Sequence, residues 1–371
     1  MKMKIPYFPE PVDLDERAEY IAKLHFSKKC GAPYWIKYQE KNKVNLSGID
    51  SWEKLMDIPP QPEAVLQPVW NGGKKEYDYN PPADLLLPKA MRKEVLYQSQ
   101  SSGSTQKPKK CIWSRSSLGE SIASSNYYLE RMGVPRNVDW MIVGPATLYQ
   151  EYMLQLARSR GSNPPYFVSV PTEGIKPLFA KPIDGLDEGP KYYRRRIIED
   201  SVSGVKAYLE GGSNIKVMIA LPFNIDDFVD IPEMRNLDTI LFVGFGMNGG
   251  KIREWKEAFP KQKILGFYTH FMNATAPYVP RKGHLDYYAA EPLVHFDVAE
   301  YDERRPGEVS IVRYGERGRI CFTRAGNDIF WRQWEDAATR IRPCELFPWD
   351  GVRDVDRFVP MKHASTLECL S

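Results

Sequence analysis

Short apolar runs alternate with amphipathic stretches through the middle of the chain. The runs 138-VDWMIVG-144, 215-IKVMIALP-222 and 238-DTILFVG-244 are apolar almost throughout. Further strands are expected at 165–171 and 263–268, a short helix or loop at 224–235, and amphipathic helices at 117–133, 148–160, 193–210 and 250–259. Apolar strands separated by such helices are typical of a parallel sheet covered on both faces. The pattern predicts an α/β fold.

The two ends of the chain follow other patterns. Helical spacing predicts helices at 13–29 and, with a Ser or Asp cap, at 48–58, whereas 59–90 is rich in Pro, Asn and Gly and is expected to be irregular. Beyond residue 292 three alternating segments indicate antiparallel strands: 294-VHFDVAEY-301, 307-GEVSIVRY-314 and 318-GRICFTR-324.

Composition narrows the function classes. The 371 residues carry a net charge of +3 from 51 basic and 48 acidic side chains, without the basic field of a nucleic-acid binder. No apolar run reaches the roughly 20 residues that a membrane helix needs, and the N-terminus lacks the apolar core of a signal peptide. Five cysteines form no CxxC pair, which indicates a reducing compartment. We expect a cytoplasmic protein without nucleic-acid or membrane partners.

The segment 99-SQSSGSTQKPKK-110 holds almost nothing that could enter a core. Its hydroxyls, backbone N–H groups and lysines could bind phosphate oxygens. It is not a Walker loop, because Pro108 stands where that motif requires glycine followed by lysine. A solvated surface loop is the alternative interpretation.

Nine positions of this segment resemble a known motif. The stretch 101-SSGSTQKPK-109 is similar to S-S-G-(S/T)-T-G-x-P-K, the phosphate loop of the adenylate-forming superfamily, with Gln106 replacing a glycine. That superfamily includes acyl-CoA synthetases, peptide-synthetase adenylation domains and luciferases. The resemblance implies phosphate-binding roles for Ser101, Ser102, Gly103, Ser104, Thr105 and Lys109, with Lys109 also catalytic.

Other landmarks occur in the family's order, over roughly 45–350. The segments 51-SWEKLMDIPP-60 and 111-CIWSRSSLGE-120 resemble the phenylacetate–CoA ligase branch, and 315-GERGRICFT-323 resembles G-E-x-G-E-L-x-x-T. The stretch 331-WRQWEDAATRI-341 resembles R-Y-R-T-G-D-x-x-x-I and implies that Asp336 binds the ribose hydroxyls, as a carboxylate can. Arg353, in a segment that resembles the family hinge G-R-x-D-D, is a second ribose candidate.

The adenine and substrate regions follow the family less closely. The resemblance assigns adenine and neighbouring nucleotide contacts to Gly244, Phe245, Gly246, Tyr268 and Thr269, and acid-substrate contacts to Tyr149, Tyr152 and His270. In 266-GFYTHFMNATAP-277, Phe271 and Met272 replace a phosphate-binding Thr and a magnesium-binding Glu. A thioether does not bind Mg²⁺, which requires oxygen ligands. Asn273, one position on, is the catalytic candidate, and the metal ligands are not identified.

The end of the chain also departs from the family. A mobile domain of about a hundred residues with a catalytic lysine is expected after the hinge, but only 361-MKHASTLECLS-371 remains. We therefore expect an N-terminal segment (1–90), an adenylate-forming core (91–345, α/β to 290 and β-rich from 291) and a hinge-like remnant (346–371). Cys369 invites comparison with the acyl-accepting cysteine of bacterial acyl-protein synthetases; a tail cysteine without a role is the alternative.

One motif favours a different chemistry. The run 244-GFGMNG-249 is a formal G-x-G-x-x-G between a strand and a helix, as in dinucleotide-binding oxidoreductases. It lies two-thirds along the chain, however, and the next strand lacks the acid that would bind a ribose 2′-hydroxyl.

The sequence thus predicts ATP- and Mg²⁺-dependent adenylation of an aromatic carboxylic acid. The acyl group would then pass to CoA or to a partner protein, and the sequence does not distinguish between these two acceptors. A nucleotide- or acyl-adenylate-binding homologue without catalysis is the alternative, and an NAD-dependent oxidoreductase the remote one.

Overall fold

A computed structural model describes most of the chain. The described residues are 12–67, 69–71, 76–78, 85–100, 109–145, 148–170, 183–211, 214–244, 247–270, 272, 274–281 and 283–356. The chain divides into two compact units, which we call the terminal unit (residues 1–117 and 285–371) and the central unit (118–284).

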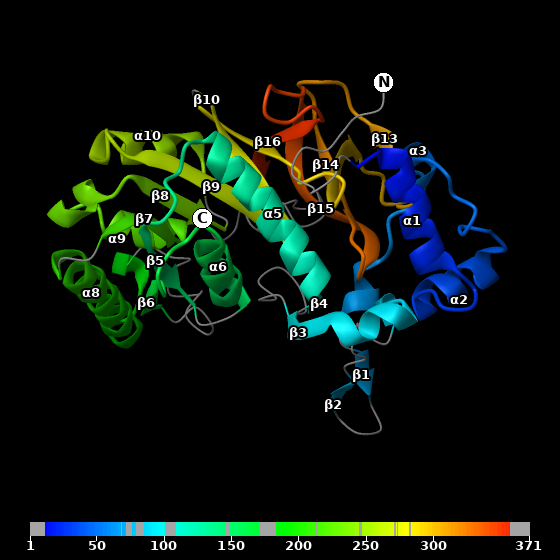
Figure 1. Cartoon of the computed structure of the whole chain (residues 1–371), viewed down its shortest axis with the longest axis horizontal. Helices are drawn as coiled ribbons and strands as arrows, with labels where there is room; N and C mark the ends of the chain where they lie inside the picture. The colour runs from blue at the N-terminus through cyan, green and yellow to red at the C-terminus, as the bar shows by residue number, and fades with distance from the viewer. Residues whose placement is uncertain are drawn as a thin grey trace. The chain divides into compact units, whose positions relative to one another are not determined.

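The central unit is built on five parallel strands (Figure 1). They are β5 (Asp139–Gly144), β6 (Tyr166–Ser169), β7 (Ile215–Ala220), β8 (Thr239–Val243) and β9 (Lys263–His270). Their order is β9-β8-β7-β5-β6, and β10 (Ala274–Arg281) adds to β9 as an antiparallel strand. Every residue of β5 and β8 is buried, so both faces of the sheet are covered. The predicted α/β fold is confirmed.

The helices of this unit lie close to their predicted positions. They are α5 (Arg115–Arg131), α6 (Leu148–Ser159), α8 (Glu188–Glu210), α9 (Pro222–Asp227) and α10 (Gly249–Ala258). Helix α5 begins in the terminal unit. Two short 3₁₀ helices, η3 (Ile183–Gly185) and η4 (Pro232–Asn236), also belong to the central unit. Helix α8 starts five residues before the predicted 193, and Gly189 and Pro190 in its first turn explain why its start has no periodic signal. Asn248 caps α10 by accepting from the Lys251 backbone N–H.

The terminal unit contains the antiparallel sheet that the alternating segments predict. Its strand order is β13 (Ser310–Ile311), β12 (Val294–Glu300), β14 (Arg317–Ala325), β15 (Phe330–Ile341), β16 (Gly351–Asp356) and β11 (His284–Tyr288). The expected strand at 307–314 is wrong in extent, because only Ser310 and Ile311 pair with β12. The strands β10, β11, β15 and β16 were not predicted.

Three helices near the start of the chain belong to the same unit: α1 (Leu14–Phe26), α2 (Pro33–Asn42) and α3 (Trp52–Met56). Asp13 caps α1 and Ser51 caps α3 through their side-chain oxygens. Helix α2, which the sequence pattern missed, packs Trp35 against Phe330, and the Trp35 Nε1–H donates to the Phe330 carbonyl at 3.0 Å. Helix α2, together with Phe26 of α1, therefore covers the start of β15.

The segment 59–90, predicted to be irregular, contains short regular pieces. These are η1 (Glu63–Leu66), the antiparallel pair β1 (Val69–Asn71) and β2 (Glu76–Asp78), and the start of η2 (Lys89–Glu94). After it come β3 (Val95–Gln100) and β4 (Lys110–Ser114), which pair with each other. The residues 101–108 between them are called the serine loop.

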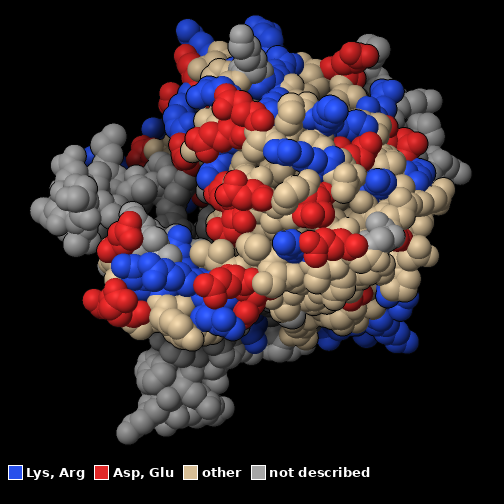
Figure 2. All heavy atoms as spheres, turned by 90° about the vertical axis from the view of Figure 1, so that its left-hand side faces the viewer, with Lys and Arg blue, Asp and Glu red and all other residues tan. Residues whose placement is uncertain are grey.

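The described surface is mixed in charge. Figure 2 shows basic and acidic side chains side by side on one face of the molecule. Within the described part of the chain, no helix has both the length and the apolar character needed to span a membrane.

Candidate functional site

The serine loop itself lies outside the described residues, and so do several predicted positions. They are Ser101, Ser102, Gly103, Ser104, Thr105, Phe245, Gly246, Asn273 and Cys369. Tyr149 belongs to α6, but its side chain is not described. The remaining predicted residues fall into two groups, one in each unit.

Lys109 is the last residue of the loop motif and precedes β4. The residue is 7% exposed, and its Nζ lies 3.5 Å from the Glu335 Oε1 of β15. The two residues are 226 positions apart in the chain. Burial limits the screening of this ion pair by water. Since Glu335 precedes Asp336, the structure brings the end of the serine loop next to the segment predicted to bind ribose.

Glu335 is held by a row of side chains on β15. Trp331, Gln333 and Glu335 are spaced by two, so they project from the same face of the strand. The Trp331 Nε1–H donates to Gln333 Oε1 at 2.7 Å, and the Gln333 amide donates to Glu335 Oε1. Trp331 and Gln333 are fully buried, which gives the carboxylate a fixed support.

Asp336 lies at an irregularity in the sheet. Opposite β14, Arg319 pairs with Ala337 and Cys321 with Trp334, so β15 has one extra residue at Glu335–Asp336. The freed carbonyl of Glu335 accepts from Arg319 Nε at 2.8 Å. Bulges of this kind turn side chains away from the regular alternation and are frequent beside active sites.

The neighbouring strand β16 has a second bulge. Its register with β15 shifts between Ala337 and Thr339, and Asp354 adopts the left-handed region with φ of 49°. The Asp354 Oδ1 accepts from the Leu285 backbone N–H at 3.0 Å, which holds this turn. The hinge-like motif of the sequence therefore falls on a distorted strand.

Arg353 forms an ion pair with a carboxylate in the same unit. Its Nε and Nη2 donate to the two oxygens of Asp286 at 2.6 and 2.9 Å. Asp286 is fully buried. Of the predicted ribose pair, Arg353 could therefore reach a ligand only through its remaining donors.

A buried ionic cluster fixes the far end of β4. Asp328 accepts from the Ser114 hydroxyl at 2.8 Å, from Arg324 Nη2 at 3.1 Å and from the Ile329 backbone N–H at 2.8 Å. Burial disfavours the ionised carboxyl, but Arg324 and the serine hydroxyls outweigh it, so the pKa of Asp328 lies below its usual range. The cluster ties β4 to the turn between β14 and β15.

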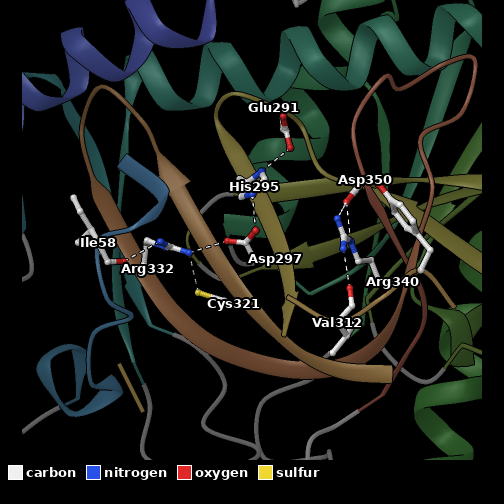
Figure 3. Close-up of polar contacts among 10 residues, drawn as sticks. Ile58, Glu291, His295, Asp297, Val312, Cys321, Arg332, Arg340 and Asp350 are labelled. Atoms are coloured by element: carbon white, nitrogen blue, oxygen red, sulfur yellow. Dashed lines mark hydrogen bonds and ion pairs between the residues drawn. The ribbon is translucent and has the colours of Figure 1, made fainter. Parts of the chain in front are cut away.

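A second charged network supports the first half of β15 (Figure 3). His295 contacts Glu291 at 2.6 Å and Asp297 at 3.0 Å, and Asp297 accepts from Arg332 Nη2 at 2.7 Å. Burial would lower the pKa of His295, but the carboxylates of Asp297 and Glu291 raise it to about 10. Arg332 also donates to the Ile58 carbonyl at 2.9 Å. The network supports β15, and no local sequence pattern predicts it.

In the central unit, Gly244, Tyr268, Thr269 and His270 lie at the carboxyl ends of β8 and β9. Ligands of open parallel sheets bind at this edge. Gly244 has a φ of 111°, a conformation that favours glycine. The Met272 backbone N–H donates to His270 Nδ1 at 3.4 Å, so the other ring nitrogen of a neutral His270 carries the proton.

Tyr152 has a different environment. It is 2% exposed, and its hydroxyl lies 2.7 Å from Ser125 Oγ and 3.2 Å from the Ser121 carbonyl. Burial raises the pKa of Tyr152 to about 12. Its hydroxyl is therefore engaged between α5 and α6 within the central unit.

The position expected to bind magnesium does not fit a metal ion. Met272 is fully buried, and its thioether side chain carries no oxygen that could bind Mg²⁺. Among the described residues, no group of three or more His, Cys, Asp or Glu side chains could hold a metal ion.

Sequence reasoning missed Glu335 and Asp286, the partners of Lys109 and Arg353. A weak signal existed for Glu335, because Gln333 and Glu335 are polar residues at alternate positions of a strongly aromatic strand. Nothing local marked Asp286, which pairs with Arg353 across 67 positions.

Comparison with known proteins gives a likeness at the level of structure. No protein-family model matches the sequence, and no curated protein does. An open conformation of 2-hydroxyisobutyryl-CoA ligase in complex with 2-HIB-AMP and CoA matches 91% of this chain at 14% identity, with a TM-score of 0.60. The same ligase in its postadenylation state with 2-HIB-AMP matches 89% of the chain with a TM-score of 0.56.

The chain spans 67% and 63% of the length of these two ligase chains. At this identity the likeness establishes the fold alone. The chain therefore has an α/β fold similar to that of this ligase.

Proposed function

We propose that the chain is an ATP-dependent adenylate-forming ligase acting on a small carboxylic acid. The observation that carries the proposal is the ion pair of Lys109 with Glu335, next to the bulge that carries Asp336. Two segments that resemble the phosphate and ribose motifs thus meet in one unit of the fold. The likeness to a ligase solved with an acyl-adenylate supports the same chemistry.

In the proposed reaction, a carboxylate oxygen of the acid attacks the α-phosphorus of ATP. A new bond forms between that oxygen and the α-phosphorus. The bond between the α-phosphorus and the oxygen that bridges to the β-phosphate breaks, so acyl-AMP and pyrophosphate are released. Positioning and charge neutralisation are the protein's main contributions to such a transfer. Lys109 would neutralise phosphate charge together with the serine loop, and Asp336 would accept from the ribose hydroxyls.

The central-unit residues are proposed to take the roles that the resemblance implies for them. Tyr268 is proposed to stack on adenine, with Gly244 and Thr269 beside it. His270, Tyr149 and Tyr152 are proposed near the acid, and Asn273 near the reacting groups. Magnesium bound by the phosphates of ATP would supply further positive charge, with its protein ligands unassigned.

An aromatic acid is the proposed substrate, and CoA or a partner protein the proposed acyl acceptor. The CoA option is supported by the ligand of the similar ligase. Because this chain spans only about two-thirds of that ligase, transfer from acyl-AMP is a separate proposal from adenylation.

One observation favours a second function. The fully buried Met272 removes the expected metal-binding carboxylate, so the chain could bind a nucleotide or acyl-adenylate without reacting. This alternative predicts nucleotide binding without pyrophosphate chemistry.

ATP–pyrophosphate exchange with Mg²⁺, across a panel of aryl and aliphatic acids, separates the two functions. Adenylation predicts exchange that depends on one class of acid and that falls at least tenfold in Lys109→Ala. The matched control is Lys256→Ala, a lysine in the last turn of α10, and it should leave the exchange unchanged. ATP binding by calorimetry without exchange for any acid would reject the enzyme and favour the binding protein.

A further inference from the structure

The carboxylate of Glu335 lies next to the ammonium of Lys109, the lysine that is proposed to bind phosphate. The side chains of Lys109 and Glu335 are 9% and 14% exposed. In such a partly dry environment the interaction between two charges is stronger than in water. A phosphate that approaches Lys109 therefore has to compete with Glu335 for the ammonium group.

We propose that Glu335 is a positioning residue that orients Lys109 and at the same time competes with the nucleotide phosphates for its charge. The inference rests on the proposed function and deepens it, because it assigns a control on phosphate binding to a residue outside the sequence motifs.

The geometry gives Glu335 little freedom. Its side chain is held through Gln333, which is fixed by Trp331. Its backbone carbonyl accepts from Arg319, whose guanidinium lies 4.3 Å from the centre of the Tyr301 ring. A carboxylate fixed at both backbone and side chain can fix a flexible lysine in turn.

The two effects of Glu335 act in opposite directions. Its negative charge weakens the attraction between Lys109 and an anionic ligand, whereas its hydrogen bonding keeps the ammonium in one orientation. Loss of the charge should therefore tighten the binding of ATP and slow the chemical step. A residue needed only for folding would weaken binding and rate together.

Glu335→Gln is the first test variant, because it removes the charge and keeps the size. We expect calorimetry to give a dissociation constant for ATP about three- to tenfold lower than in the unchanged protein. The rate of pyrophosphate exchange should fall about tenfold, as a misplaced catalytic group costs rate. The matched control is Glu308→Gln, an exposed carboxylate paired with Arg305, for which neither quantity should change.

A double-mutant cycle shows whether Glu335 acts through Lys109. The dissociation constant for ATP is measured for Glu335→Gln in the unchanged protein and in Lys109→Ala. If the effect runs through Lys109, the second measurement shows less than about a twofold change, since the pair no longer exists. Equal effects in the two backgrounds would overturn the inference, and so would unchanged or weaker binding in the single variant.

Glu335→Asp adds a variant that keeps the charge and shortens the side chain. We expect slower exchange with an ATP affinity near that of the unchanged protein. Absence of exchange in the unchanged protein would reject the proposed function, while the binding cycle would still decide the role of Glu335. Urea unfolding of each variant establishes that the proteins compared are folded.

Discussion

Arg353 of β16 and Asp286 of β11 are directly opposite each other and form a bidentate ion pair. The Arg353 Nε and Nη2 lie 2.6 and 2.9 Å from the two carboxylate oxygens of Asp286. The two members differ in exposure. Asp286 is fully buried, whereas the side chain of Arg353 is 27% exposed. The pair therefore joins two strands and fixes a residue predicted to approach the ribose.

This difference predicts unequal costs when either partner is removed. Arg353→Met should lower the free energy of unfolding by about 3–5 kcal/mol, because it removes the guanidinium that faces a fully buried carboxylate. Asp286→Asn should cost about 1–3 kcal/mol, since Arg353 reaches water and an amide oxygen can still accept. Urea unfolding measures both.

The exposed ion pair of Arg305 with Glu308 is the control for these variants. Arg305→Met should change stability by less than about 1 kcal/mol, as surface ion pairs do. A cost for Asp286→Asn equal to or larger than that for Arg353→Met would contradict the argument from burial.

Asp336→Ala should weaken nucleotide binding by about 1.5–3 kcal/mol, the range for hydrogen bonds to a charged group. Titration with AMP by calorimetry measures this without requiring turnover. Asp356→Ala is the matched control, because Asp356 is an exposed aspartate opposite Ala337, one residue beyond Asp336. Equal AMP affinity in the unchanged protein and Asp336→Ala would remove Asp336 from the ribose site.

The central sheet depends on a glycine in its interior. Gly266 of β9 lies opposite Phe242 of β8, and a Cβ atom at Gly266 would come within 2.5 Å of the Phe242 carbonyl oxygen. The two strands are fixed by their ladder and cannot move apart cheaply. Gly266→Ala should therefore lower the free energy of unfolding by about 1–3 kcal/mol or more.

Gly119 provides the opposite case in the same protein. It lies on an exposed position of α5, and a Cβ there would meet nothing within 4 Å. Gly119→Ala should raise stability by about 0.5–1 kcal/mol, because alanine favours a helix over glycine. A stable Gly266→Ala protein would mean that β8 and β9 can separate locally.

The sequence pattern was sufficient for the elements whose periodicity is strong. The strands β5, β7 and β8 are apolar in all but one position each, and α1 combines an apolar stripe with an N-terminal Asp cap, so each was located within a few residues. The strand β15 was missed, because its bulge at Glu335–Asp336 and its mixture of arginine, tryptophan and carboxylates break the period of two.

The candidate site was predictable only where its residues stand in a local motif. Lys109 and Asp336 stand in motifs whose spacing is visible in the sequence. Their surroundings depend on pairings across the chain, such as Lys109 with Glu335 and Arg353 with Asp286, and no local pattern encodes these. The residues that fix the site therefore came from the structure.

His25 predicts how the stability of the protein depends on pH. It is fully buried in α1, and its Nε2 lies 3.0 Å from the Gly326 carbonyl oxygen, to which the neutral ring donates. Burial lowers the pKa of His25 to about 4, against the raising effects of Gly326 and Asp328. The folded protein therefore holds fewer protons at this residue than the unfolded chain does between pH 4 and pH 6.5.

The sign follows from that difference. The stability contribution of the neutral ring is complete above about pH 6.5 and is lost as the pH falls toward 4. Between pH 7.5 and pH 5 this residue should lower the free energy of unfolding by about 2 kcal/mol.

His25→Gln keeps a donor for the Gly326 carbonyl and cannot titrate. The free energy of unfolding of this variant should therefore fall by about 2 kcal/mol less over the same pH range. Urea unfolding at the two pH values measures this, with His284→Gln, at an exposed position, as the control. Equal pH dependence in the unchanged protein and His25→Gln would show that the buried ring is not the group that titrates.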